Sequence, residues 1–353
     1  MSFTTTVAGR TWHFSHALGR PTAEHNGETG GCLFPSGLAL SPDGILFILN
    51  RGQGQPTFSD NPSDFYRRIG KTTVEEEHFG DFARYEFTWP SGIAVAGDGI
   101  VYAADEYDNV ISYYDPDATI PFPDFNPDGE RLGDWGESGS EPGQLDGPAG
   151  LAFDSADDLY VVDSRNDRVQ KFTKDGTYLM GWGRPGSGEG EFNRPWGITI
   201  SRAGDVYVAD WGNNRIQKFT PEGKYLATFG SSSGYGGDLD HPADVAVDSE
   251  GDVYVADWGN RRIQIYEPTG DVITALYGDA REPSKAGAYV MGRDVKVMEQ
   301  TTKTTSDHPG LANIGRFGLI TSVVVDGKDR IIASDSWGRL QVYVKDPDYE
   351  PAL

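Results

Sequence analysis

One segment of this chain recurs at a fixed interval, and this repetition limits the possible fold more than any other feature. The clearest copies begin at Pro148, Pro195 and Pro242, so that consecutive copies start 47 residues apart. Weaker copies remain in register, which places the starts of six repeats near residues 35, 90, 148, 195, 242 and 320. A period of this size with several short strands in each unit predicts the blades of a β-propeller.

Each complete repeat contains four short runs in which apolar and polar residues alternate, and these runs predict four antiparallel strands. The sixth repeat ends after its third run, LQVYV (340–344), whereas residues 11–19 (TWHFSHALG) resemble the missing fourth run. We therefore expect a single all-β domain over residues 1–353, a six-bladed β-propeller of four-stranded antiparallel blades. The N-terminal strand should complete the last blade and close the ring, which removes two exposed sheet edges.

The charge balance and the cysteine content narrow the function and the location. The chain has 30 Lys and Arg against 54 Asp and Glu, a formal charge of −24, which disfavours binding to nucleic acid or to an anionic membrane surface. Cys32 is the only cysteine, so neither an intramolecular disulfide nor a Cys-rich zinc site is expected. The N-terminus has no secretory-signal pattern and no apolar run is long enough to span a bilayer, which predicts a cytoplasmic protein.

Three of the repeats carry a specific family signature. The runs VVDSRNDRVQKF (161–172), VADWGNNRIQKF (208–219) and VADWGNRRIQIY (255–266) resemble NHL repeats, a resemblance that implies a six-bladed propeller. The blades are also similar to those of peptidyl-α-hydroxyglycine amidating lyases, which hold zinc with histidines just after the blade-leading proline. Here the six corresponding residues include no histidine: Ser36, Ser91, Ala149, Trp196, Ala243 and Thr321. The cofactor is therefore unknown, and a divalent cation stays open although no metal-ligand motif is found.

A polar residue lies fifteen positions after each repeat start and can be interpreted in two ways. These residues are Asn50, Asp105, Asp163, Asp210, Asp257 and Asp335. A ring of carboxylates could bind a cation, but a residue type repeated in nearly every blade is more simply structural. We interpret the carboxylates as groups that cap turns and pair with Arg168, Arg215 and Arg262. Asn50 breaks the pattern and is a candidate ligand-binding residue.

Three long insertions suggest which face of the propeller carries a site. Residues 51–67 and 279–317 fall on connections that should emerge on one face, whereas residues 115–129 fall on the opposite face. Long loops in a compact domain commonly form lids or binding loops. The face with two insertions is therefore the expected ligand face.

Several residues predicted on that face suit a planar, sugar-like or carboxylate-bearing small molecule, through stacking and bidentate hydrogen bonds. The candidate ligand-binding residues, besides Asn50, are Trp196, Trp211, Trp258, Trp337, Tyr107 and His308. The candidate catalytic residues are His241, Asp244, Arg165 and Arg51, with His241 and Asp244 as a possible acid/base pair. The alternative for Trp211 and Trp258 is packing between blades, since they recur in register.

Two functions remain open from the sequence. The first is a small-molecule binder or a hydrolase- or lyase-type enzyme that acts at the mouth of the central channel under residues 279–317. The second is an NHL interaction scaffold without catalytic activity, whose partner is a protein or peptide.

Overall fold

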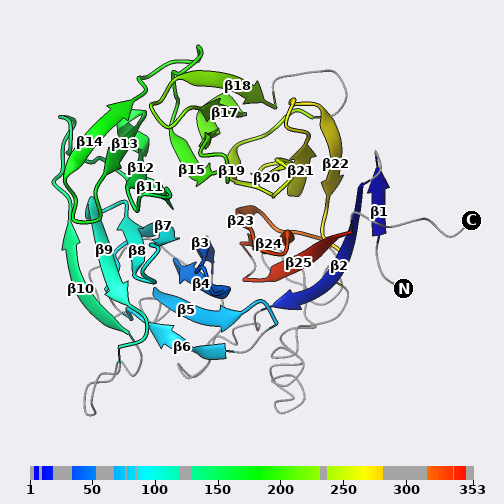
Figure 1. The fold of residues 1–353 in the computed structure, drawn as a ribbon, viewed down its shortest axis with the longest axis horizontal. Helices are drawn as coiled ribbons and strands as arrows, with labels where there is room; N and C mark the ends of the chain where they lie inside the picture. The colour runs from blue at the N-terminus through cyan, green and yellow to red at the C-terminus, as the bar shows by residue number, and fades with distance from the viewer. Residues whose placement is uncertain are drawn as a thin grey trace, which may run out of the picture.

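The structure, a computed structural model, is a ring of six antiparallel sheets around a central axis, as the repeat predicts (Figure 1). It describes residues 4–7, 10–18, 34–52, 67–75, 78–84, 86–118, 129–230, 237–280, 316–336 and 338–346. The predicted fold class is therefore confirmed. No helix in these ranges is long and apolar enough to cross a bilayer.

Each blade runs from an inner strand at the axis to an outer strand at the rim (Figure 1). The inner strands are β3 (Pro35–Leu40), β7 (Pro90–Val95), β11 (Pro148–Phe153), β15 (Pro195–Ile200), β19 (Pro242–Val247) and β23 (Ile320–Val325). The second strands are β4 (Ile45–Asn50), β8 (Val101–Asp105), β12 (Leu159–Asp163), β16 (Val206–Asp210), β20 (Val253–Asp257) and β24 (Arg330–Asp335). The third strands are β5 (Arg68–Thr73), β9 (Val110–Asp115), β13 (Arg168–Phe172), β17 (Arg215–Phe219), β21 (Arg262–Tyr266) and β25 (Leu340–Asp346). The outer strands are β6 (His78–Phe82), β10 (Glu130–Trp135), β14 (Tyr178–Trp182), β18 (Tyr225–Phe229), β22 (Val272–Leu276) and, in the last blade, β2 (Arg10–Leu18).

The N-terminal strand closes the ring as predicted. β2 pairs antiparallel with β25, in a register that sets Thr11 opposite Asp346 and Leu18 opposite Leu340. Trp12 and Leu18 are almost fully buried, so the strand contributes to the core as well as to the sheet. β1 (Thr4–Val7) then pairs with β2 and adds a fifth strand that the repeat pattern did not indicate.

A buried ionic cluster, not foreseen from the sequence, fastens this closure to the fifth blade. The Lys345 ammonium lies 2.5 Å from Asp248, 2.8 Å from Glu250 and 2.8 Å from Asp252. Arg10 of β2 adds a second cation, 2.8 Å from Asp252. These carboxylates raise the pKa of Lys345, although burial alone would lower it. The last strand and the closing strand are therefore both tied to the same turn of the neighbouring blade.

The recurring aspartates are structural, as interpreted from the sequence. Asp210 is fully buried, accepts a 2.7 Å bond from Arg215 Nε and also accepts the backbone N–H of Asn193. The same arginine bond recurs at 2.7 Å in the two neighbouring NHL-like blades, from Arg168 to Asp163 and from Arg262 to Asp257. Each carboxylate therefore joins the end of a second strand to the loop that enters its blade.

Glycine lets the inner strands approach closely at the axis. A Cβ added to Gly150 would lie 2.5 Å from the backbone oxygen of Trp196 in the next blade, and one added to Gly92 would lie 1.9 Å from that of Ala149. Real Cβ atoms do not tolerate such distances, so these strands pack backbone against backbone. The equivalent residue is also glycine at 37 and 197, but it is Asp244 in the fifth blade and Ser322 in the sixth.

Candidate functional site

One end of the ring opens into a cavity of about 690 Å³, which we call the mouth cavity. Its lining comes from all six blades and comprises Phe34, Pro35, Ser36, Arg51, Gly52, Trp89, Glu106, Gly147, Ser164, Arg165, Arg194, Trp196, Trp211, Ala243, Trp258 and Thr321. This volume lies in the range of sites for small organic molecules.

The mouth cavity is built from three recurring positions of the blade. One is the residue before the repeat start, such as Trp89 and Arg194, and another is the residue after it, such as Trp196. The third is the residue after the second strand, such as Arg51 and Trp211. Because the six blades repeat these positions around the axis, their side chains converge on one opening.

Arg51 is held rigidly in the wall of the mouth cavity. Its Nη2 lies 2.6 Å from Oε1 of Glu106, and its guanidinium lies 4.1 Å from the centre of the Trp89 ring. Burial lowers the pKa of Arg51 to about 10, against the opposing effect of Glu106, and burial also raises the pKa of Glu106. Both shifts show that this ion pair is largely removed from water, and that Arg51 stays charged at neutral pH.

Arg165 adjoins this pair from the third blade. Its Nη1 donates to the backbone oxygen of Glu106 and lies 3.3 Å from Asp146. The guanidinium is about half exposed, so it reaches the cavity with solvated donors. Glu106 therefore connects the two predicted arginines, Arg51 through its side chain and Arg165 through its backbone.

Trp196, Trp211 and Trp258 supply aromatic surface on the opposite part of the lining. All three are half-buried. The ring of His241 lies 4.1 Å from that of Trp211 and 6.3 Å from that of Trp258, between two adjacent blades. Trp211 and Trp258 thus pack against an interblade residue and also line the mouth cavity. The structure is therefore compatible with both alternatives for these residues, which were packing between blades and ligand binding.

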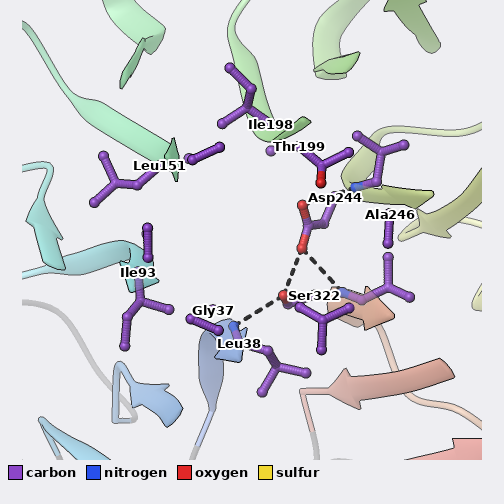
Figure 2. A pocket seen from close by; sticks show the side chains of 18 of the residues that line it. Gly37, Leu38, Ile93, Leu151, Ile198, Thr199, Asp244, Ala246 and Ser322 are labelled. Atoms are coloured by element: carbon purple, nitrogen blue, oxygen red, sulfur yellow. Dashed lines mark hydrogen bonds between the residues drawn. The ribbon is translucent and has the colours of Figure 1, made fainter. Parts of the chain in front are cut away.

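Below the mouth cavity lies an axial channel of about 330 Å³, walled by the six inner strands (Figure 2). Ser36, Trp196, Ala243 and Thr321 line both spaces, so the channel continues the mouth cavity along the axis. Its wall is mainly apolar where Ile93, Leu151 and Ile198 lie. The mouth cavity and the channel together form a funnel with an aromatic, arginine-bearing entrance.

Asp244 is one of three carboxyl groups in the wall of this channel, with Asp326 and Asp329, and it lies on the inner strand β19 (Figure 2). Its Oδ2 accepts a 2.6 Å bond from Ser322 Oγ and a 3.1 Å bond from the Val323 N–H. Ser322 Oγ itself accepts the N–H of Leu38, so its proton is directed at Asp244. Burial raises the pKa of Asp244 to about 6, although these donors lower it. The carboxyl group can therefore exchange a proton near neutral pH.

The predicted catalytic residues do not form one cluster. Arg51 and Arg165 adjoin in the mouth cavity, whereas Asp244 lies in the channel. His241 Nδ1 is 2.5 Å from Oδ1 of Asp240, and Asp244 bonds Ser322 and Val323. The predicted His241–Asp244 acid/base pair is thus not formed, because the histidine turns toward the interblade loop and the aspartate toward the axis.

The remaining candidates lie elsewhere. Asn50 is buried and donates to the backbone oxygen of Ile48, and Tyr107 is half exposed but does not line the mouth cavity. Trp337 and His308 are outside the described residues, as is most of the insertions 51–67, 115–129 and 279–317. In the described ranges no group of three or more His, Cys, Asp or Glu side chains could hold a metal ion.

Trp89 and Arg194 were not predicted in the site from the sequence, although both line the mouth cavity together with Glu106. Trp89 and Arg194 occupy the position immediately before the repeat start. The sequence does mark this position. The residue before the recurring proline differs from blade to blade (Phe, Trp, Gly, Arg or His), as expected of a position that the shared blade structure does not fix.

Comparison with known proteins supports the repeat assignment. The NHL repeat family matches residues 145–172, 192–219 and 239–266, which are the third to fifth blades. No curated protein sequence matches the chain at a significant level.

Similar solved structures show the same fold at low identity. A protein of unknown function from Bacteroides thetaiotaomicron is 14% identical with a TM-score of 0.58, over 96% of this chain and 76% of that one. Virginiamycin B lyase from Staphylococcus aureus is 13% identical with a TM-score of 0.51, over 94% of this chain and 99% of the lyase. A streptogramin B lyase is 11% identical with a TM-score of 0.52, over 97% and 100% of the two chains. The chain therefore contains three NHL repeats and folds as a six-bladed β-propeller.

Proposed function

We propose that this protein binds a small organic molecule in the mouth cavity and acts on it as a hydrolase- or lyase-type enzyme. The observation that carries the proposal is the continuous funnel, in which an aromatic entrance leads to Asp244, whose pKa burial raises to about 6. A group with a pKa near the working pH is suited to both accept and donate a proton.

The chemistry divides between the two parts of the funnel. Arg51 and Arg165 orient the ligand at the entrance, and the tryptophans supply the apolar surface on which it stacks. Asp244 acts as the general acid/base on the part of the ligand that enters the channel. Lyase activity is described for two proteins with this fold, which makes elimination the first reaction class to test.

A thermal-shift screen of small carboxylates, lactones and sugars tests binding, because a ligand that binds only the native state raises the melting temperature. Asp244→Asn tests the catalytic role, since it keeps the size of the side chain and removes the exchangeable proton. We expect kcat to fall at least 100-fold while ligand affinity changes by less than about threefold. The matched control is Asp175→Asn, which makes the same change at an exposed turn of the third blade, outside the funnel. Unchanged turnover in Asp244→Asn would refute the assignment.

The alternative function, a protein- or peptide-binding scaffold, is favoured by one observation on the rim. Leu132, Leu179 and Leu226 occupy the same position of three successive outer strands and are 44–46% exposed. Such a repeated apolar stripe is a feature of interaction surfaces. The test is a pull-down in which the proteins bound by the unmodified chain are compared with those bound by the Leu179→Glu/Leu226→Glu variant. A partner that the variant loses, together with no response in the small-molecule screen, would favour the scaffold.

A further inference from the structure

The charge of the mouth cavity is opposite to that of the whole protein. The chain has a formal charge of −24, yet the ionisable residues that line the mouth cavity are three arginines and one glutamate: Arg51, Arg165, Arg194 and Glu106. A local excess of positive charge at a concave opening raises the concentration of anions there, and the acidic surface around it makes the contrast larger. Anionic small molecules should therefore be drawn to this opening and repelled elsewhere.

Two hydrogen-bond donors in the wall of the cavity lack acceptors. Arg51 Nε and Trp89 Nε1 are both buried and have no hydrogen-bond partner among the described residues. They belong to side chains that stack on one another, with the guanidinium 4.1 Å from the ring centre. A buried donor without an acceptor is energetically unfavourable, so it calls for an explanation such as a bound ligand, an ion or a water molecule.

The other donors of Arg51 are divided between the protein and the cavity. Nη2 is bonded to Glu106. Nη1 has no hydrogen bond to any described residue, and unlike Nε it is not a buried atom without a partner. Arg194 also forms no ion pair with a described residue, and its side chain is exposed at the same opening. The cavity thus offers two cations that are not fully satisfied, with indole surface beside them.

We propose that the ligand of the mouth cavity is a small aromatic carboxylate, held by Arg51, Trp89 and Arg194. This inference rests on the proposed small-molecule function and specifies its ligand class. The carboxylate accepts from Nη1 of Arg51 and from the exposed guanidinium of Arg194, and Trp89 holds the Arg51 guanidinium in place by stacking on it. The aromatic part stacks on the tryptophans across the opening.

A carboxylate fits this site better than a more highly charged anion. Glu106 pairs with Arg51 at 2.6 Å and Asp146 pairs with Arg165 at 3.3 Å, which leaves the charge of Arg194 as the net excess at the opening. Planar carboxylates match the fork of a guanidinium in two parallel hydrogen bonds. A neutral amide of the same shape would leave the cations without a counter-charge.

The test compares acids with their matched amides on the intact chain. Indole-3-acetate, 4-hydroxybenzoate and phenylpyruvate are titrated beside the corresponding amides and phenyl phosphate, by calorimetry and by quenching of tryptophan fluorescence. We expect at least one carboxylate to bind at least tenfold tighter than its amide, with a preference that weakens as salt concentration rises.

Three variants assign the preference to residues. Arg194→Gln, at an exposed side chain, should weaken carboxylate binding several-fold without affecting the fold. The double variant Arg51→Gln/Glu106→Gln removes the ion pair without leaving a buried charge, and should reduce the acid-to-amide preference to within about twofold. Arg184→Gln changes an arginine that is 77% exposed and outside the cavity, and should bind as the unmodified protein does.

The outcomes separate this inference from the function on which it rests. Amides that bind as tightly as their acids would overturn the carboxylate site and leave small-molecule binding intact. Phenyl phosphate binding more than tenfold tighter than every carboxylate would also overturn it, in favour of phosphate. A loss of preference in Arg184→Gln equal to that in the double variant would show a general charge effect. Failure of acids and amides alike to bind would overturn the aromatic carboxylate, and only a further failure of every lactone and sugar in the thermal-shift screen would refute small-molecule binding.

Discussion

Trp12 should be one of the residues on which the stability of the ring depends most. It lies in β2, its side chain is 1% exposed, and its Nε1 donates to Tyr254 Oη at 3.1 Å. Tyr254 in turn donates to Asp248, which bonds Lys345. Trp12→Ala would therefore leave a large cavity where the closing strand meets the fifth blade and would remove one bond of a buried network.

The expected loss follows from the burial. Truncating a fully buried tryptophan to alanine costs about 3–5 kcal/mol of unfolding free energy. For a chain of this size each kcal/mol lowers the melting temperature by roughly 2 °C, so we expect a fall of about 6–10 °C. Trp12→Phe, which keeps most of the apolar volume and loses only the hydrogen bond, should cost about 1–2 kcal/mol. The measurement is thermal and urea unfolding followed by far-ultraviolet circular dichroism and by calorimetry.

The matched control is Leu226→Ala in β18, an outer strand with an equivalent place in its blade. Leu226 is 44% exposed, so its truncation should change stability by less than about 0.5 kcal/mol. Deletion of residues 1–20 should be more damaging than either substitution, because it removes the whole fourth strand of the last blade. Equal shifts for Trp12→Ala and Leu226→Ala would show that the closing strand does not hold the ring together.

Three other substitutions test further features. Lys345→Met leaves Asp252 and the neighbouring carboxylates without their common cation. We expect the free energy of unfolding, measured in urea, to fall by about 3–5 kcal/mol. The loss should be smaller at acidic pH, where the carboxylates are protonated. Asp244 has a folded pKa of about 6, above its ordinary value, so its contribution to stability is complete below about pH 4 and is lost as pH rises through 6. Asp244→Asn should remove this pH dependence, which is about 3 kcal/mol, and identical pH profiles would contradict it. Gly150→Ala places a methyl group 2.5 Å from a backbone oxygen and should destabilise the chain by more than 2 kcal/mol, whereas Gly327→Ala meets nothing within 4 Å and should be neutral in the same thermal assay.

The fold could be predicted from the sequence because the repeat specifies local structure many times over. Four strands per unit, the recurring aspartate and the missing fourth strand of the sixth repeat each follow from pattern alone. The cluster around Lys345 and the fifth strand β1 could not be predicted, because they join residues far apart in the chain and have no counterpart in the other blades. Contacts made once in a repeat protein leave no periodic signal.

The site was only partly predictable for a related reason. Arg51 and Arg165 follow the ends of second strands, and Trp196 lies at the start of an inner strand, so their common location follows from the register of the blades. The partners of His241 and Asp244 depend on which way each side chain turns. His241 has a φ of 53°, a left-handed conformation that it shares with Phe34, Gly147 and Arg194 at the same position of the repeat. Asp244 fills a position that is glycine in four other blades.

The pairing of β2 with β25 has a consequence for how the protein is made. β2 ends at Leu18 and its partner begins at Leu340, so almost the entire polypeptide must leave the ribosome before the two can meet. At ordinary rates of synthesis the first strand waits on the order of tens of seconds, with Trp12 exposed and an open sheet edge. During that interval the nascent chain is a substrate for chaperones and for pairing with a second copy, and a circular permutant that makes these strands neighbours in sequence would avoid the delay.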